Sequence, residues 1–81
     1  MKVTVQFFSY FKDLAGCDKF TASVTAGATI ADLLGVIYQQ FPKLEPMRKS
    51  TLVAVGVDYQ DRAYVLKEGD EVALFPPVQG G

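Results

Sequence analysis

The chain lacks several residue types on which enzymes and metal sites commonly depend. It contains no histidine, no tryptophan and a single cysteine, Cys17. The chain therefore lacks the residues needed for a zinc site, for a Ser–His or Cys–His nucleophile pair, or for acid–base catalysis by histidine. Before the end of the chain the glycines stand singly, so there is no glycine-rich loop to cradle a phosphate. The sequence predicts a protein that binds no metal or cofactor itself and does not catalyse a reaction alone.

Charge and length exclude further classes. Eight basic and nine acidic residues give a net charge of −1 without a long run of either sign, so a nucleic-acid partner is not expected. No apolar run approaches the ~20 residues of a membrane span, and residues 1–4 begin no secretory signal. Small secreted domains usually carry several disulfides, which one cysteine cannot form. We expect a cytoplasmic protein that does not associate with membranes.

The hydrophobic pattern predicts a small α+β domain. Apolar residues alternate in the first strand and recur at helical spacing in one long helix, which Thr29 and Asp32 begin as a capping box. Gly35 inside this helix costs ~1 kcal/mol against alanine, and close packing on a sheet would explain it. The expected elements are a strand at 2–8, a helical turn at 9–15 closed by Gly16, a strand at 19–24, the helix at 30–41, a further turn around 44–47, a strand at 52–57, a brief pairing at 63–65 and a strand at 71–75.

Parallel pairing of the first and last strands would give a β-grasp, ubiquitin-like fold: a mixed sheet with one main helix packed on one face. We expect this domain to span residues 1–75. Residues 76–81 form the second expected unit, an extended, flexible tail that ends in Gly-Gly. Pro76 and Pro77 end the last strand because proline cannot donate a ladder hydrogen bond.

The tail is the first candidate for chemistry. Glycine has no Cβ, so the carboxylate of Gly81 is uncrowded, and Gly80 with Gly81 can thread a narrow channel. Six residues reach ~20 Å when extended, and the two prolines lower the entropy lost on insertion. The alternative is a frayed and silent terminus. Nearer the domain, Phe8 and Phe75 are expected on the outward faces of neighbouring strands, either as a partner-docking patch or as a cross-strand pair.

Three segments resemble the family of small, sulfur-carrying subunits of molybdopterin synthase, within the ubiquitin-like sulfur-carrier superfamily. The most specific is the closing run Phe75-Pro76-Pro77-Val78-Gln79-Gly80-Gly81, preceded by Gly-Asp-Glu-Val at 69–72. The others are the first strand with its short helix at 5–16 and the long helix at 29–41. Gly56 departs from the family, which often has asparagine after the central strand.

The resemblance implies that Gly81 is a substrate of other proteins. An adenylating partner would activate its carboxylate with ATP, and a sulfur donor would then displace AMP to leave a thiocarboxylate. The thiocarboxylate would donate sulfur to cyclic pyranopterin monophosphate in molybdenum cofactor biosynthesis, two carriers supplying the two dithiolene sulfurs. In this scheme ATP is used by the partner and not held by this chain.

The resemblance also implies the partners. They are the large, catalytic subunit of molybdopterin synthase, in a heterotetramer, a ubiquitin-activating-type adenylyltransferase and a sulfur-donor protein. The chain would thus be the sulfur-donating subunit of a sulfurtransferase complex. Pro76, Pro77, Val78 and Gln79 join Phe8 and Phe75 as expected partner-binding residues, with Gly80 and Gly81 at the reacting end.

Other readings stay open at this point. One is a sulfur carrier for thiamine, cysteine or thiolated tRNA, and another is a ubiquitin-like protein modifier joined to lysines through Gly81. A plain interaction module is a fourth class. Cys17 is expected to be an inert turn thiol, with a persulfide carrier as the alternative. Lys43, Arg48 and Lys49 follow the helix as a solvated basic cluster, with a contact to the adenylating partner as the alternative.

Overall fold

The computed structural model describes residues 1–77. Within them no helix has both the length and the apolar run needed to cross a membrane. The elements, in chain order, are β1 (Lys2–Phe7), α1 (Tyr10–Ala15), β2 (Lys19–Ser23), α2 (Ile30–Gln40), the 3₁₀-helix η1 (Pro42–Met47), β3 (Leu52–Val55), β4 (Asp58–Tyr59) and β5 (Glu71–Phe75).

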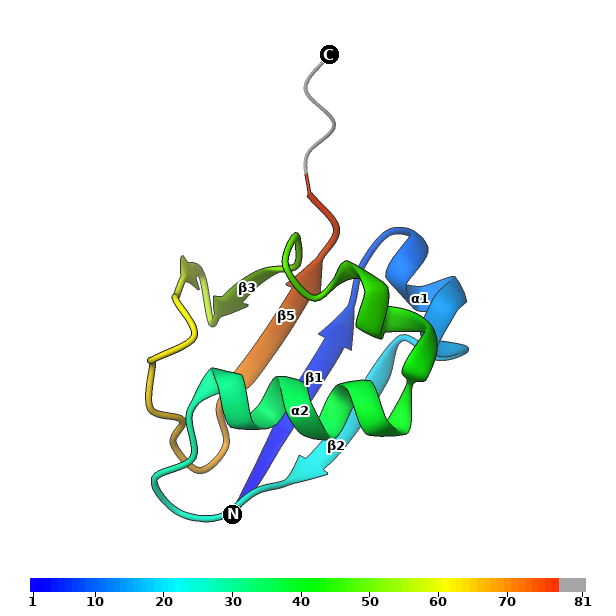
Figure 1. Ribbon diagram of the computed structural model, residues 1–81. Helices are drawn as coiled ribbons and strands as arrows, with labels where there is room; N and C mark the ends of the chain where they lie inside the picture. The colour runs from blue at the N-terminus through cyan, green and yellow to red at the C-terminus, as the bar shows by residue number, and fades with distance from the viewer. Residues whose placement is uncertain (78–81) are drawn as a thin grey trace.

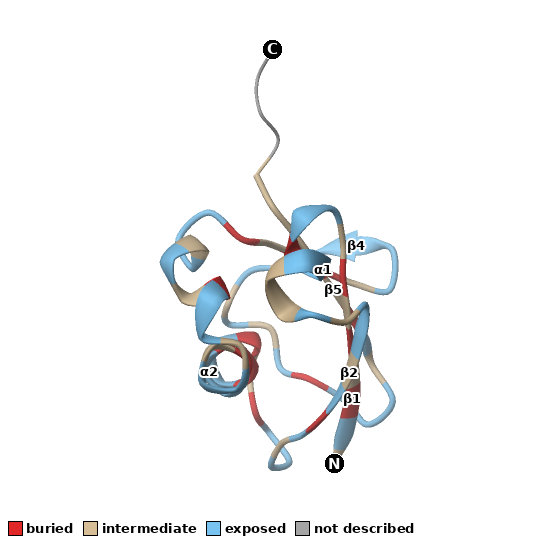
Figure 2. Cartoon of the chain, turned by 90° about the vertical axis from the view of Figure 1, so that its right-hand side faces the viewer, coloured by how far each residue is buried: buried red, intermediate tan, exposed pale blue. Residues whose placement is uncertain are grey.

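The five strands form one mixed sheet in the order β2-β1-β5-β3-β4. β1 and β5 pair in parallel at its centre, whereas the other neighbouring strands are antiparallel. α2 crosses one face of this sheet, and no helix of residues 1–77 covers the opposite face (Figures 1 and 2). This arrangement confirms the predicted β-grasp fold.

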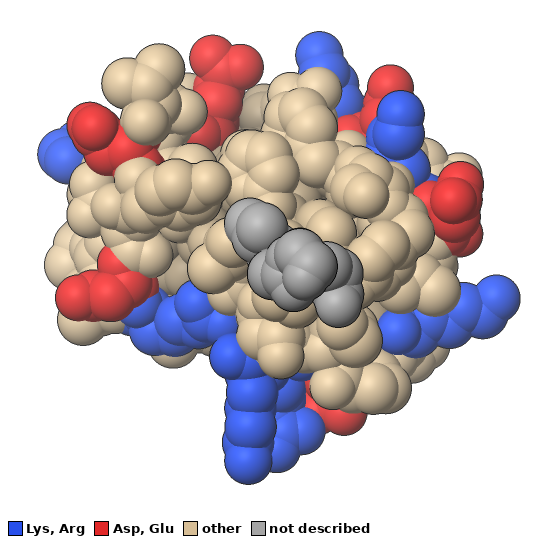
Figure 3. All heavy atoms as spheres, turned by 90° about the horizontal axis from the view of Figure 1, so that it is seen from above, with Lys and Arg blue, Asp and Glu red and all other residues tan. Residues whose placement is uncertain are grey.

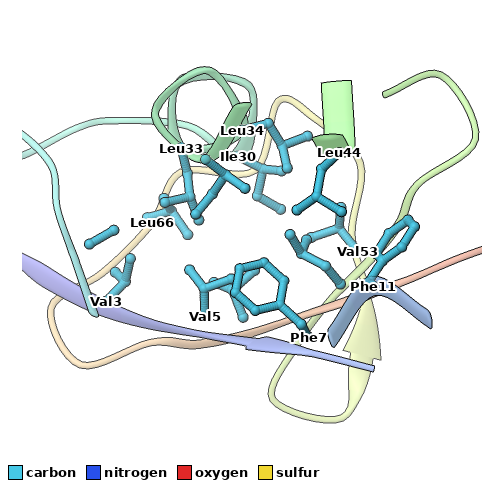
Figure 4. Packing of buried hydrophobic residues seen from close by; sticks show 14 residues of the cluster. Val3, Val5, Phe7, Phe11, Ile30, Leu33, Leu34, Leu44, Val53 and Leu66 are labelled. Carbon is cyan, nitrogen blue, oxygen red and sulfur yellow. The ribbon is translucent and has the colours of Figure 1, made fainter. Parts of the chain in front are cut away.

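The core fills the space between α2 and the sheet (Figure 4). Val3, Val5 and Phe7 point inward from β1, as the alternation predicted, and each is at most 1% exposed. α2 contributes Ile30, Leu33, Leu34 and Ile37 from its buried side. Burying one large apolar side chain fully is worth about 1.5–3 kcal/mol relative to exposure, so this two-sided packing holds the single helix in place.

Local signals set the ends of the helices. The Thr29 side chain accepts a hydrogen bond from the Asp32 backbone, and the Asp32 carboxylate accepts one from the Thr29 backbone, which confirms the capping box. α2 ends at Gln40, two residues before Pro42. α1 ends at Ala15 and is capped by Gly16, whose φ of 80° is left-handed and whose N–H donates to the Lys12 carbonyl.

The fourth strand does not lie where the sequence predicted it. β4 occupies Asp58–Tyr59, between the strand predicted at 52–57 and the pairing predicted at 63–65, and it joins β3 through a two-residue loop. Gly56 takes φ = 63° in that loop, a conformation that glycine adopts without strain and that favours a tight hairpin. Of the segment predicted to pair at 63–65, Val65 makes one isolated bridge, to Thr29.

The expected reason for Gly35 is wrong. A Cβ built on Gly35 meets no atom within 4 Å, and the residue is exposed rather than packed on the sheet. Its backbone is helical, so no left-handed conformation requires a glycine here either. The fold of residues 1–77 therefore gives no reason for a residue that weakens the helix.

Candidate functional site

Three aromatic side chains gather on the helix-free face of the sheet, where β5 ends. The ring of Phe8 stacks on that of Phe75, with centroids 4.7 Å apart and planes 13° from parallel. Tyr59 of β4 meets Phe75 edge to face at 6.2 Å. We call Phe8, Tyr59 and Phe75 the aromatic patch. It adjoins Pro76, where the chain leaves the sheet.

Strand register places these rings together. Phe7 of β1 lies opposite Leu74 of β5, and both side chains are buried against the helix side. The next residue on each strand, Phe8 and Phe75, must then face the other way, because successive side chains alternate across a sheet. The Phe8 backbone N–H donates to the Leu74 carbonyl at 3.1 Å. This bond holds the residues that follow β1 beside the end of β5.

The patch borders a hollow of about 450 Å³ on the same sheet face. Its floor includes Ala54 and Ala73, which are too small to fill the space between larger neighbours. Tyr59 is 69% exposed and Val57, at the β3–β4 hairpin tip, is 96% exposed. Large apolar side chains gathered in the open around a hollow are typical of a surface that binds another protein.

Charge is sparse around this end of the molecule. Viewed from the end at which β5 finishes, the central surface carries uncharged residues and the charged side chains lie around its margin (Figure 3). An uncharged, apolar surface is inexpensive to desolvate when a partner covers it. The base of the tail is therefore suited to docking.

The structure brings together the predicted aromatic residues. Phe8 and Phe75 are in contact, and both are half-buried. Pro76 and Pro77 follow β5 directly, half-buried and outside any helix or strand. The remaining expected site residues lie outside the described residues: Val78, Gln79, Gly80 and Gly81. The docking role of the patch remains a prediction.

Sequence reasoning missed Tyr59 and Val57. Val57 was expected at the end of the strand at 52–57, and Tyr59 in the turn that follows that strand, and neither was given a role. The signal was Gly56 directly after the apolar run at 52–55, because a glycine hairpin would return the chain antiparallel to β3 and place Tyr59 opposite Ala54. That register puts an aromatic ring on the outward face, beside Phe75.

Within residues 1–77, no three His, Cys, Asp or Glu side chains lie close enough to hold a metal ion. Cys17 is a half-buried free thiol that packs against the core cluster. What residues 1–77 show is a partly exposed aromatic patch next to the segment on which the sequence places the chemistry.

Comparison with known proteins gives one consistent result. The family model described as "ThiS family" matches residues 5–81. The molybdopterin synthase sulfur carrier subunit of Chlamydomonas reinhardtii is 36% identical over 84 aligned positions that cover all of both chains. The corresponding subunit of Arabidopsis thaliana is 27% identical, covering all of this chain and 84% of its own length.

Solved structures of related proteins have the same fold as this chain. A putative molybdopterin converting factor subunit 1 from Pyrococcus furiosus superposes with a TM-score of 0.88 at 31% identity, covering 96% of this chain and 99% of that one. Small archaeal modifier protein 1 of Haloferax volcanii superposes with a TM-score of 0.87 at 26% identity. The match covers 95% of this chain and 98% of that one. A chain from the complex of subunits 1 and 2 of the molybdopterin-converting factor of Helicobacter pylori gives 0.71 at 27% identity, with both chains fully covered.

Proposed function

This chain belongs to the ThiS family, and we propose that it is the sulfur-carrier subunit of a molybdopterin synthase. The observation that carries the proposal is full-length similarity, at 36% identity, to a subunit of that name. The match covers the whole of both chains, so it includes the closing Phe-Pro-Pro-Val-Gln-Gly-Gly run.

The reaction that follows from this proposal takes place at Gly81. A carboxylate resists nucleophiles because it is negatively charged and has no good leaving group. An adenylating partner overcomes this when a carboxylate oxygen attacks the α-phosphorus of ATP and releases pyrophosphate. A sulfide-equivalent donor then attacks the acyl carbon, AMP leaves, and the carboxylate has become a thiocarboxylate.

In this proposal residues 1–77 bind the partners and so position the C-terminus. In the proposed complex the aromatic patch lies against the large subunit, which fixes the start of the tail relative to that subunit's active site. The complex of subunits 1 and 2 from Helicobacter pylori supports a large-subunit partner, because its subunit chain is 27% identical to this one. Assembly as a heterotetramer, the adenylyltransferase and a cytoplasmic location belong to the same proposal.

Pathway and role can be separated by genetic complementation. Expression of this chain in a strain that lacks its own molybdopterin synthase small subunit should restore molybdoenzyme activity. A variant without Gly81 should fail while keeping the melting temperature of the intact chain, since the core described by the structure is built from residues 1–74. Failure of the intact chain with a matched large subunit would contradict the assignment to this pathway.

A second candidate function is protein modification. Its support is the TM-score of 0.87 with small archaeal modifier protein 1, at 26% identity. In that role the activated carboxyl of Gly81 would be attacked by a lysine amine instead of a sulfur nucleophile. Isopeptide adducts of this chain on other proteins of its host, detected by mass spectrometry of tryptic digests, would support it.

A further inference from the structure

A second groove lies along α2, on the opposite side of the sheet from the aromatic patch. The groove has a volume of about 440 Å³ and is open to solvent along one side. Ala31, Leu34 and Gly35 of α2 line its apolar part, and Tyr38 lies one turn further along the helix. Arg48, Lys49 and Arg62 complete the lining. We call this set of residues the α2 groove.

The positive rim of this groove is assembled from distant parts of the chain. Arg48 and Lys49 follow η1, whereas Arg62 comes from the connection between β4 and β5. The guanidinium of Arg62 donates to the Arg48 carbonyl at 2.8 Å, and the Arg62 carbonyl accepts from the Ala31 N–H at 3.1 Å. These bonds fix the rim to the first turn of α2, so the groove does not depend on mobile side chains alone.

The charge of the rim is unbalanced. Arg48 is paired with Glu45, but within residues 1–77 neither Lys49 nor Arg62 makes an ion pair with a carboxylate. In the view from the β5 end, the largest group of Lys and Arg side chains gathers on the α2 side of the molecule (Figure 3). On a chain of net charge −1 this concentration is local, and it favours an anionic occupant.

Two residues of the groove are unexplained by the fold. Gly35 weakens α2 without a conformational or packing reason, yet the missing side chain is what leaves the floor open. The hydroxyl of Tyr38 is buried and has no hydrogen-bond partner among the described residues. A buried polar group without a partner costs about 1–3 kcal/mol, and the fold of residues 1–77 offers this hydroxyl no hydrogen bond in return. The open floor at Gly35 suits close approach by another chain.

We propose that the α2 groove binds an acidic segment of the partner that adenylates Gly81, an inference that rests on the function proposed above. An apolar side chain of that segment sits over Gly35, and its carboxylates face Lys49 and Arg62. The groove is shallow and open, unlike the enclosed pockets that hold small ligands. Three cations on a slightly acidic chain are too few to track a nucleic-acid backbone.

The position of the groove favours the adenylating partner over the large subunit. Both proteins must receive the same tail in turn, and both need room beside the aromatic patch. A contact on the opposite side of the sheet lets the adenylating partner recognise the carrier independently of that shared surface. Such a separate contact gives each partner its own determinant of specificity.

The test is the steady-state rate of pyrophosphate release by the adenylating enzyme of the same organism, with the full chain as substrate. Gly35→Gln fills the groove with a residue that also has higher helix propensity. We expect it to raise the KM for the carrier about tenfold with kcat unchanged, the pattern of lost uniform binding. Its melting temperature should equal or exceed that of the parent. Val36→Gln, which adds the same side chain beside the groove, is the matched control.

Charge is tested separately. Lys49→Gln should raise KM about threefold at low ionic strength, and the effect should shrink in high salt because exposed charges are screened. Lys2→Gln makes the same change in net charge at the other end of the sheet and should leave KM unaltered.

The outcomes distinguish the two proposals. If the parent is adenylated and both groove variants keep its KM, the groove is not a contact and the proposed function stands. If the parent is not adenylated at all, the proposed function fails and this inference fails with it. Binding of a labelled single-stranded RNA that Lys49→Gln abolishes would instead assign the groove to nucleic acid and overturn the proposal.

Discussion

The ring of Phe8 lies flat against the ring of Phe75, with centroids 4.7 Å apart. Phe8 begins the connection to α1, and Phe75 is the last residue of β5. Their contact joins an early part of the chain to the base of the tail. It therefore fixes both the aromatic surface and the place from which residues 76 and 77 leave the sheet.

Truncation of this pair tests the docking surface. We expect Phe75→Ala to weaken binding to the molybdopterin synthase large subunit by about 2 kcal/mol, because central aromatic residues dominate interface energies. Isothermal titration calorimetry measures the affinity. Tyr10→Ala, which removes a 39% exposed aromatic side chain outside the patch, should have little effect. An unchanged affinity for Phe75→Ala, with its fold intact, would show that the patch only stabilises the sheet.

Ser9 carries backbone strain next to the same patch. Its φ of 56° with ψ of −141° lies in a positive-φ region that residues with a Cβ rarely adopt, and its side chain makes no cap hydrogen bond to α1. Ser9→Gly should therefore raise the free energy of unfolding by roughly 0.5–1 kcal/mol, even though glycine has more conformations in the unfolded chain. Urea denaturation measures this change. Ser50→Gly, at an exposed residue without positive φ, should lower stability, and the same loss at position 9 would exclude strain there.

Substitution of glycine by alanine should have opposite effects on stability at positions 35 and 16. Gly35→Ala should stabilise the protein by about 1 kcal/mol, because the helix gains propensity and the added Cβ meets nothing within 4 Å. Gly16→Ala should destabilise it by a similar amount, since φ at this position is 80°. Thermal denaturation of the two variants checks both signs. A loss of stability for Gly35→Ala would mean that the helix needs glycine for its own packing.

Two buried hydroxyls should also respond differently. Tyr38→Phe should leave stability unchanged or raise it by up to about 1 kcal/mol, because no described residue bonds the Tyr38 hydroxyl. Thr51 is 4% exposed and its hydroxyl donates to the Met47 carbonyl at 2.9 Å, so Thr51→Val should cost about 1 kcal/mol. Chemical denaturation compares the two. Equal losses would indicate that the Tyr38 hydroxyl has a partner of comparable strength.

The sequence predicted the fold well where one face of an element is buried. Apolar residues alternate along β1 and recur at helical spacing along α2 because one side of each element faces the core, so both elements could be predicted. The capping box at Thr29 and the left-handed Gly16 are local, so neighbouring residues suffice to predict them.

Prediction failed where tertiary context decides. β4 is two residues long and exposed, so its pairing depends on the neighbouring strand and the Gly56 hairpin rather than on a hydrophobic pattern. Tyr59 was missed for the same reason. The α2 groove could not be predicted either, because Arg62 reaches Arg48 across a fold that sequence spacing does not reveal.

Intact-mass spectrometry of the full chain tests the central claim most directly. After incubation with its adenylating enzyme, ATP and sulfide, the protein should gain the mass difference of one oxygen replaced by sulfur. Fragmentation should place the change on Gly81, and omission of ATP should prevent it. Unmodified carboxylate in the complete reaction, with a folded chain and an enzyme that is active on a known carrier, would contradict the account.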